Sequence, residues 1–324
     1  MLSYQHAFHA GNHADILKHL TLTGVLTSLN KKDKPYTYFD THSASGLYDL
    51  MDNRAEKTGE AAQGIMRLMS SLKDDSSTCL HSSEAAVRSL PPAKANSRES
   101  SHFSGSHPLL SAYLALIRQY TSKSLYPGSP EIGRLLLRPS DYMILSELHP
   151  QEIENLRRNM IKSPFCQAAC SQIQIHARNG FEMLKALTPP KTKRGAVLID
   201  PSYEEASDYR DVADTICAVN KKWSNGIIML WYPLLAHRES EINLMLEKIT
   251  ESARLVNANI EIADLRLEVA SKDAHKEMSL KDYEQSEKNP PRLYGSGMLV
   301  LNAPWHLKED VCNEIEYIKG ILKL

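Results

Sequence analysis

The stretch VLIDPSYEE, residues 197–205, combines a strand-like apolar run with a charged and aromatic end. Its apolar, β-branched start is typical of a strand buried on both faces, as in a parallel sheet between helices. The strand ends on Asp200, and a proline, a serine and Tyr203 follow at once. A charge at this place is either a simple strand stop at an Asp-Pro turn or a group that holds a flat, polar ligand.

Similar apolar runs recur along the chain, and helical patterns lie between them. Strands that alternate with helices predict βαβ units and a mostly parallel sheet covered on both faces. We therefore expect a doubly wound, Rossmann-like α/β fold with about seven strands, near residues 34–40, 141–150, 173–181, 195–201, 225–233, 259–269 and 297–305. A helix with one apolar face is expected over residues 12–30, with Asn12 as its N-cap.

Residues 61–126 interrupt this alternation. The segment is helical at first, becomes rich in serine and mixed charge near 72–107, and then returns to a helical pattern. We predict a helical insertion between the first and second strands, with a flexible Ser-rich stretch. The catalytic domain would comprise residues 1–60 and 127–324, with the N-terminal segment contributing to the active site. A second loose stretch, 271–292, separates the last two strands.

The composition is that of an ordinary soluble protein, with 42% hydrophobic and 24% charged residues and a net charge of −1. No apolar run approaches the roughly 20 residues that span a bilayer, and the N-terminus lacks a secretory pattern. Five scattered cysteines favour a reduced, cytoplasmic protein, and the lone CxxxC of Cys166 and Cys170 does not predict zinc. The histidines between residues 6 and 19 do not place three on one helix face, so we expect no metal. We expect some of them to line a pocket as neutral hydrogen-bonding groups.

Polar residues stand where four of the predicted strands stop: Asp40, Glu147, Asn179 with Gly180, and Asp200. The carboxyl ends of parallel strands meet along one edge of a sheet, and nucleotide-like cofactors bind in the crevice there. A carboxylate such as Glu147 can accept hydrogen bonds from both hydroxyls of a ribose. The usual spacing of about 20 residues to this acid fails here, because the insertion lies between Asp40 and Glu147.

Asp200 and its neighbours fit one particular chemistry. An exocyclic aromatic amine is a poor nucleophile because its lone pair is delocalised into the ring. A carboxylate that accepts one N–H, with the Pro201 carbonyl accepting the other, favours the nitrogen geometry that can attack a methyl group. Tyr203 can then stack on the base, a contact worth roughly 1–3 kcal/mol. The similar residues 302–305, Asn-Ala-Pro-Trp, are interpreted as packing at the sheet edge.

Blocks along the whole chain resemble the bacterial 23S ribosomal RNA adenine-N6 methyltransferases. The resemblance is carried, in order, by MLSYQHAFHAGNHADILKH, KDKPYTYFDTHSASGLY, YPGSP, LSELHP, RNGFEML, LIDPSYE, LWYP and SGMLVLNAPW. It covers nearly the whole chain except the Ser-rich insertion and residues 271–292. The N-terminal block is the most specific part, because many amino-methyltransferases share a DPPY-type tetrapeptide. The resemblance implies a class I, S-adenosylmethionine-binding fold with a helical insertion.

The resemblance also implies roles for single residues. Asp200 would be the catalytic acceptor facing the adenine amine, Pro201 and Tyr203 would hold the target base, and Tyr4 would touch the RNA. The residues that would contact S-adenosylmethionine, or its product S-adenosylhomocysteine, are His19, His42, Ser129, Glu147, Asn179, Gly180 and Asp200. Glu147 would hold the ribose. The partner would be an unpaired or flipped-out adenine of 23S rRNA, and the enzyme a monomer without a metal.

Three positions depart from the family's pattern: Ser202 in the tetrapeptide, Ala44 where HAGAG has a glycine, and Asn179 where an aspartate is usual. None removes a catalytic group, so we expect activity to be kept. Two alternatives remain. The tetrapeptide also permits N6 methylation of DNA adenine or N5 methylation of a protein glutamine, against which the N-terminal block argues. The second alternative is a catalytically silent RNA-binding or ribosome-assembly protein, in which Ser202 and Ala44 would mark the loss of catalytic activity.

Overall fold

The computed structural model describes residues 6–52, 59–74, 107–162, 172–273 and 293–324. Tyr4, most of the Ser-rich stretch and most of the second loose stretch lie outside these residues. Within the described ranges, no helix is long and apolar enough to cross a membrane.

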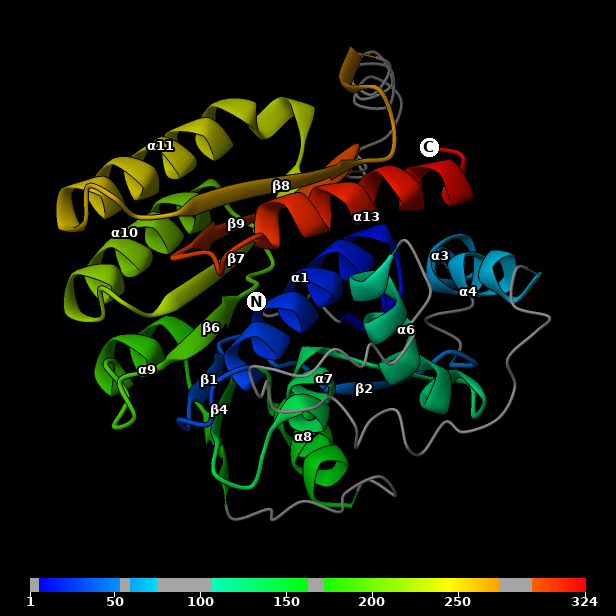
Figure 1. The fold of residues 1–324 in the computed structure, drawn as a ribbon, viewed down its shortest axis with the longest axis horizontal. Coiled ribbons are helices and arrows are strands. Elements are labelled where there is room, and N and C mark those ends of the chain that lie inside the picture. The colour runs from blue at the N-terminus through cyan, green and yellow to red at the C-terminus, as the bar shows by residue number, and fades with distance from the viewer. Residues whose placement is uncertain (1–5, 53–58, 75–106, 163–171, 274–292) are drawn as a thin grey trace, which may run out of the picture.

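A seven-stranded sheet in the order β5-β4-β1-β6-β7-β9-β8 forms the centre of the molecule (Figure 1). Its strands are β1 (Thr37–Asp40), β4 (Tyr142–Glu147), β5 (Ile173–Ala177), β6 (Gly195–Ile199), β7 (Ile227–Leu234), β8 (Ile262–Glu268) and β9 (Gly295–Leu301). Neighbouring strands pair in parallel, except that β9 runs antiparallel to both β7 and β8. The prediction of a doubly wound, mostly parallel seven-stranded sheet is confirmed.

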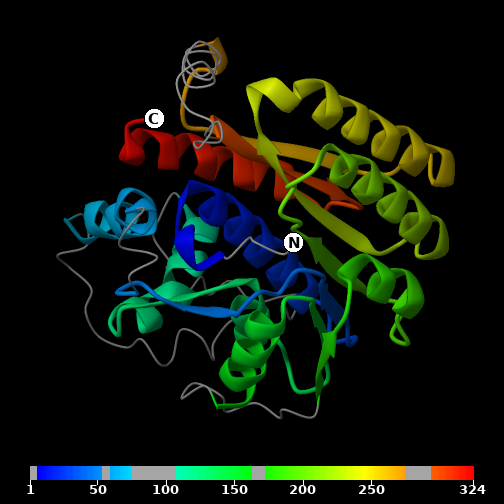
Figure 2. The ribbon, with the colours of Figure 1, turned by 180° about the vertical axis from the view of Figure 1, so that it is seen from behind.

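Helices cover both faces of the sheet, as Figures 1 and 2 show from opposite sides. On one face lie α9 (Gly180–Leu187), α10 (Ala206–Lys222) and α11 (Glu239–Val256), and on the other lie α1 (His13–Asn30), α7 (Ser129–Leu136), α8 (Pro150–Lys162) and α13 (Leu307–Leu322). Strand β6 is buried along its whole length. Val197 and Ile199 pack into one core, and Ala196 and Leu198 into the other, because side chains alternate along a strand.

Helix α1 begins as predicted, because Asn12 accepts a hydrogen bond from the backbone N–H of Asp15 at 2.9 Å. Its burial differs from the single apolar face that we expected. Most of the helix is buried, including polar residues such as Lys18 and His19. The physical reason is the central position of α1, which packs against the sheet and against α6 (Pro108–Thr121), α7 and α13.

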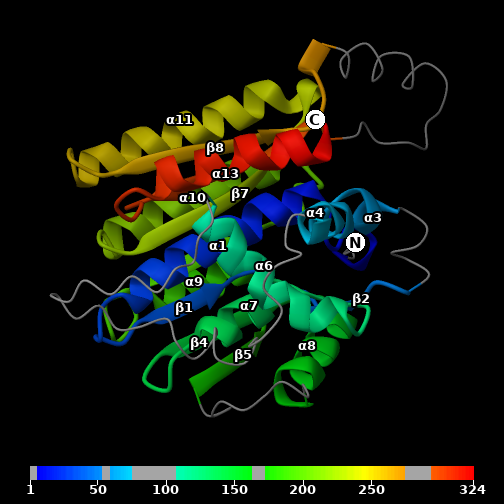
Figure 3. The same ribbon diagram turned by 45° about the vertical axis from the view of Figure 1, so that its right-hand side comes forward.

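The segment between β1 and β4 contains α3 (Glu60–Gln63), α4 (Ile65–Asp74) and α6 (Pro108–Thr121). A short antiparallel pair, β2 (Leu47–Asp49) with β3 (Leu125–Pro127), joins its two ends and was not predicted, because three-residue strands give no periodic signal. In Figure 3 α3 and α4 lie beside the N-terminal segment. Ile65 N donates to Gly11 O at 2.9 Å there. The division into a catalytic domain and an insertion stays a prediction.

Candidate active site

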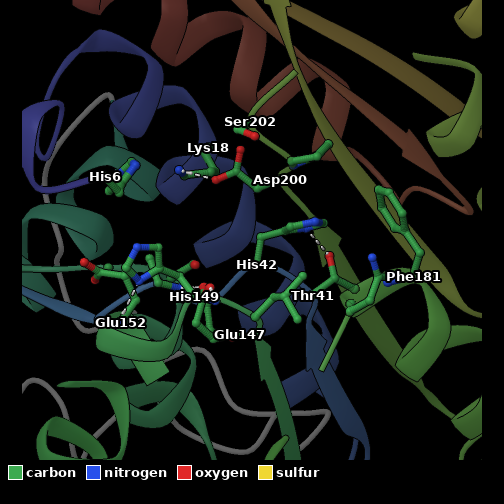
Figure 4. Close-up of a pocket in the computed structure, with 18 of the residues that line it drawn as sticks. His6, Lys18, Thr41, His42, Glu147, His149, Glu152, Phe181, Asp200 and Ser202 are labelled. Carbon is green, nitrogen blue, oxygen red and sulfur yellow. Dashed lines mark hydrogen bonds and ion pairs between the residues drawn. The ribbon is translucent and has the colours of Figure 1, made fainter. Parts of the chain in front are cut away.

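A pocket opens at the carboxyl edge of the parallel strands, where β1, β4 and β6 end (Figure 4). The seven residues for which the resemblance implies cofactor contact all line it, namely His19, His42, Ser129, Glu147, Asn179, Gly180 and Asp200. They come from distant parts of the sequence, and the parallel topology brings them together. The structure shows their proximity, and the role of each stays a prediction.

Asp200 follows the last residue of β6 and is paired with a lysine. Lys18 Nζ lies 2.6 Å from Asp200 Oδ2 and 2.8 Å from Asp15 Oδ1 (Figure 4 draws the contact with Asp200). The Lys18 side chain is 5% exposed, and a buried ammonium needs such anionic partners. Sequence reasoning missed Lys18. The available signal was a pair of opposite charges three positions apart, Asp15 and Lys18, inside an otherwise apolar helix.

Asp40 ends β1 but, in contrast to our expectation of a row of polar groups, it does not line the pocket. It is fully buried on the same face of β1 as Tyr38, whose hydroxyl donates to Asp40 Oδ2 at 2.9 Å. Burial raises the pKa of Asp40 to about 6, against the hydrogen bonds from Ser129 and Tyr38 that lower it. The structure therefore places Asp40 one layer below the pocket.

His19 and His42 line the pocket as neutral rings. Burial lowers the pKa of His19 to about 3, although the charge of Asp15 opposes this change. Burial likewise lowers the pKa of His42 to about 4. His19 Nδ1 lies 2.8 Å from the Tyr126 hydroxyl, and His42 Nδ1 lies 2.8 Å from Thr41 Oγ1. Both rings make hydrogen bonds within the protein, and their role toward a ligand stays a prediction.

The Glu147 carboxylate fixes the loop that follows β1. Its Oε2 accepts a hydrogen bond from Ala44 N and its Oε1 accepts one from His149 N, each at 2.7 Å. Ala44 has a φ of +45° and Gly46 a φ of +70°, a region of backbone conformation that favours glycine. The substitution of Ala44 for the family's glycine thus falls where a side chain costs about 1–2 kcal/mol. Each carboxylate oxygen retains a lone pair for a further donor.

Asn179 and Gly180 join β5 to α9, and a different local contact explains the residue type at each of the two positions. Asn179 caps the helix, since its Oδ1 accepts hydrogen bonds from Phe181 N at 2.9 Å and Glu182 N at 3.1 Å. The amide NH₂ of Asn179 is the part left to face a ligand. A Cβ on Gly180 would lie 2.0 Å from the Thr41 carbonyl oxygen. Only glycine therefore lets α9 begin this close to the end of β1.

Tyr203 lies elsewhere than we expected. Pro201 and Ser202 line the pocket, whereas Tyr203 is 8% exposed and belongs to the core beneath it. Its φ is +52°, and its hydroxyl donates to the Trp231 carbonyl oxygen at 3.0 Å. The ring contacts Tyr209, with centroids 4.7 Å apart. In this conformation the ring does not face the pocket, so the expected stacking on a base requires the Tyr203 side chain to move.

Two further pocket residues were given no role of their own in the sequence, although His6 is one of the histidines of which we expected some to line a pocket. His6 comes from the short helix η1 (His6–Phe8), and its Nε2 lies 3.0 Å from Asp15 Oδ2. Glu152 accepts a hydrogen bond from the Ser45 hydroxyl. The contact between Ser45 and Glu152 joins residues 107 positions apart, so no spacing rule reveals it. In the part of the chain that the structure describes, no group of three His, Cys, Asp or Glu residues could hold a metal ion.

Comparison with known proteins gives the following similarities. A family model described as "Ribosomal RNA large subunit methyltransferase D, RlmJ" matches residues 33–114 and 107–323. The protein named ribosomal RNA large subunit methyltransferase J of Escherichia coli strain K12 is 33% identical, over 99% of this chain and 94% of the relative. Its namesake in Haemophilus influenzae is 32% identical over the same shares. A crystal structure of a Legionella pneumophila protein matches with a TM-score of 0.70 and 28% identity, covering 97% of this chain and 94% of that one.

Proposed function

The chain belongs to the family of ribosomal RNA large subunit methyltransferases, and on this premise we propose that it methylates the N6 amine of an adenine in 23S rRNA. The methyl donor is S-adenosylmethionine. The observation that carries the proposal is the position of Asp200, a carboxylate that lines the strand-end pocket, next to Pro201. The enzyme acts as a cytoplasmic monomer, with residues 1–60 and 127–324 as catalytic domain and 61–126 as insertion.

The pocket fits S-adenosylmethionine by its charge. Its acidic lining residues are Glu147, Glu152, Asp200, Glu204 and Asp208. Among the described lining residues, Lys18 is the only lysine or arginine. Because His19 and His42 are neutral, the net charge of the pocket is negative and suits a ligand that carries a positive sulfonium. When bound, this cofactor supplies a methyl group on positively charged sulfur, and the electron pair of the broken carbon–sulfur bond stays on sulfur.

Several side chains of the pocket hold the cofactor in this proposal. Glu147 accepts hydrogen bonds from the ribose hydroxyls with the lone pairs that the Ala44 and His149 N–H groups leave unused. Asn179 presents its amide NH₂ to the cofactor's adenine ring. Gly180 has no side chain, so the backbone at this side of the pocket can lie close to the end of β1. His19, on α1, and Ser129, at the start of α7, are buried residues of the pocket lining and contact the cofactor in this proposal.

Asp200 and Pro201 act on the target amine. Asp200 accepts a hydrogen bond from one N–H of the adenine N6 group, and the Pro201 carbonyl accepts one from the other. Both bonds draw the lone pair out of conjugation with the ring and orient it for attack. The nitrogen gains a methyl group and then gives one of its two protons to the Asp200 carboxylate, which passes it to water. The adenine must be unpaired or flipped out of a helix to reach this depth.

The test is to incubate the purified protein and labelled S-adenosylmethionine with four acceptors: protein-free large-subunit RNA, assembled large subunits, DNA, and protein. Digestion and chromatography then identify the labelled product. We expect N6-methyladenosine in at least one of the two RNA samples. Label on DNA or on a protein glutamine instead would replace the proposal by the corresponding alternative. No transfer to any acceptor, with S-adenosylmethionine still bound, would favour a catalytically silent protein.

A further inference from the structure

Asp15 is a buried carboxylate behind the pocket, and it does not line the pocket itself. It is 1% exposed. Its Oδ1 lies 2.8 Å from Lys18 Nζ, and its Oδ2 accepts hydrogen bonds from Gly11 N at 2.8 Å and from His6 Nε2 at 3.0 Å. Burial alone raises the pKa of a carboxyl group, but the charges of His6 and Lys18 hold the pKa of Asp15 well below its ordinary value. Asp15 is therefore an ionised group.

One ammonium is shared between two carboxylates at this place. Lys18 Nζ contacts Asp15 on α1 and Asp200 after β6, and all three side chains are mostly shielded from water. A lysine in contact with Asp200 alone would cancel the charge of that carboxylate. With Asp15 ionised and the His6 ring on its Oδ2 neutral, the set of three carries one excess negative charge, beside the place where Asp200 meets its substrate. The negative charge of Asp15 thus compensates for the positive charge that Lys18 brings next to Asp200.

This excess charge matters for the reaction proposed above. The adenine nitrogen becomes positively charged as it gains the methyl group, until its proton leaves. A fixed negative charge close by, in a site of low dielectric, stabilises that developing charge more than it stabilises the neutral amine. Lys18 in turn holds the orientation of the Asp200 carboxylate, because it binds that carboxylate through the Oδ2 atom.

We infer that Asp15 is a positioning residue for the methyl transfer, which fixes the Lys18 ammonium against Asp200 and keeps the three-residue set net negative. The inference rests on the proposed function. Asp15 does not line the pocket but contacts two residues that do, Lys18 and His6, and the inference concerns its action through Lys18.

Asp15 also has structural contacts, so its effect on catalysis must be separated from an effect on folding. It accepts the Gly11 N–H and holds His6, which pins the segment before α1. Glu314 provides a matched control. It is 2% exposed, accepts the backbone N–H groups of Leu109 and Leu110, and lies 2.7 Å from a histidine nitrogen, yet it is not part of the pocket lining.

The experiment compares the wild type with Asp15→Asn, Lys18→Met, the double variant and Glu314→Gln. It measures the single-turnover transfer rate on large-subunit RNA, the dissociation constant of S-adenosylmethionine, and the melting temperature. We expect Asp15→Asn to slow transfer by about tenfold or more, with cofactor affinity changed less than about threefold. In the Lys18→Met background the same change has little further effect, because the residue through which Asp15 acts is gone.

Several results would overturn the inference. One is an unchanged transfer rate in Asp15→Asn. Another is a rate decrease by the same factor in the wild-type and Lys18→Met backgrounds, and a third is an equal rate decrease in Glu314→Gln. Each of these would assign Asp15 a purely structural role. A wild type that binds the cofactor but methylates no RNA overturns the proposed function itself, and the inference with it. If Asp15→Asn does not fold, Asp15→Glu replaces it. That variant keeps the charge but shifts it relative to Lys18, so its rate should lie between the wild type and Lys18→Met, and a wild-type rate would contradict the inference.

Discussion

Lys18 Nζ lies 2.6 Å from Asp200 Oδ2, although 182 positions separate the two residues in the chain. The contact joins α1, which packs against one face of the sheet, to the loop at the end of β6. Because a charge-assisted hydrogen bond anchors one oxygen of the carboxylate, the position of Asp200 is restrained before any substrate arrives. Preorganised acceptors of this kind need no rearrangement during the reaction.

Replacing Asp200 tests its role directly. We expect Asp200→Ala to lower the transfer rate by about a hundredfold or more, since the amine loses its charged acceptor. Cofactor binding should persist, because Glu147, Asn179 and Gly180 remain. Rapid-quench measurement of transfer and calorimetry of cofactor binding check this. Asp214→Ala, at an exposed ion pair on α10, serves as control and should keep the wild-type rate. A fully active Asp200→Ala enzyme would show that another group accepts the amine.

Gly180→Ala should disturb both stability and cofactor binding. The new Cβ would lie 2.0 Å from the Thr41 carbonyl oxygen, so α9 and the end of β1 must separate. Overpacking of this kind costs about 1–3 kcal/mol. Gly320→Ala is the matched control, because a Cβ at this position in α13 would meet no atom within 4 Å, and alanine there should be neutral or stabilising by up to about 1 kcal/mol. Urea denaturation with and without cofactor measures both effects, and equal stabilities of the two variants would contradict the steric argument.

The sheet could be predicted from the sequence because its strands are long apolar runs separated by helical periodicity. VLIDP shows this most clearly, since burial on both faces leaves a continuous apolar signal in β6. The Glu147, Asn179 and Asp200 positions at strand ends followed from the same pattern, once parallel topology was assumed. The pair of β2 and β3 could not be predicted, because strands of three residues are too short to show an alternation of apolar and polar residues.

The side-chain directions within the site were less predictable. Asp40 ends β1 and Asp200 directly follows β6, yet Asp40 is buried below the pocket and Asp200 lines it. The difference comes from the pleat and from contacts with Tyr38 and Ser129, which no strand-end rule contains. Tyr203 follows Asp200 closely, but its positive φ turns the ring into the core. Local backbone angles of this kind depend on the surrounding fold.

Glu314 of α13 should stabilise the insertion by capping α6. Its Oε1 accepts hydrogen bonds from Leu109 N and Leu110 N, at 3.1 and 3.2 Å, at a helix start whose own N-cap residue makes no side-chain bond. Glu314→Ala leaves these buried donors unsatisfied, and we expect a loss of about 1–3 kcal/mol in the free energy of unfolding. Glu316→Ala, at an exposed ion pair on the same helix, should change it by less than about 0.5 kcal/mol. Equal urea midpoints for the two variants would argue against the cap.

His42 should make stability depend on pH. Its pKa falls from 6.5 to about 4 on folding, so between these pH values the unfolded chain binds a proton that the native protein does not. Stability therefore rises with pH through this window, by about 1–3 kcal/mol for a ring that partly borders a solvent-filled pocket. His42→Asn should reduce the loss of stability between pH 7 and pH 4.5. Asp40, with its raised pKa, acts in the opposite direction, but it is common to both proteins and cancels in the comparison. Parallel stability curves for the two proteins would contradict the prediction.

Tyr203→Phe distinguishes the two roles of this aromatic residue. The variant removes the hydroxyl that donates to the Trp231 carbonyl oxygen but keeps the ring. We expect the free energy of unfolding to fall by about 1–2 kcal/mol, because a buried hydrogen bond is lost. Tyr142→Phe, at a 46% exposed ring, is the control and should leave it unchanged.

The effect of Tyr203→Phe on RNA methylation is equally informative. If the Tyr203 ring leaves the core to stack on the adenine, loss of the Trp231 hydrogen bond makes that movement easier, and the KM for RNA should stay the same or fall. Tyr203→Ala, which removes the ring, should raise KM, because stacking on a base is worth roughly 1–3 kcal/mol. Steady-state kinetics with large-subunit RNA separates the outcomes. If both variants kept the wild-type KM, Tyr203 would be a core residue in every state, and the base would be held by Pro201 and other pocket residues alone.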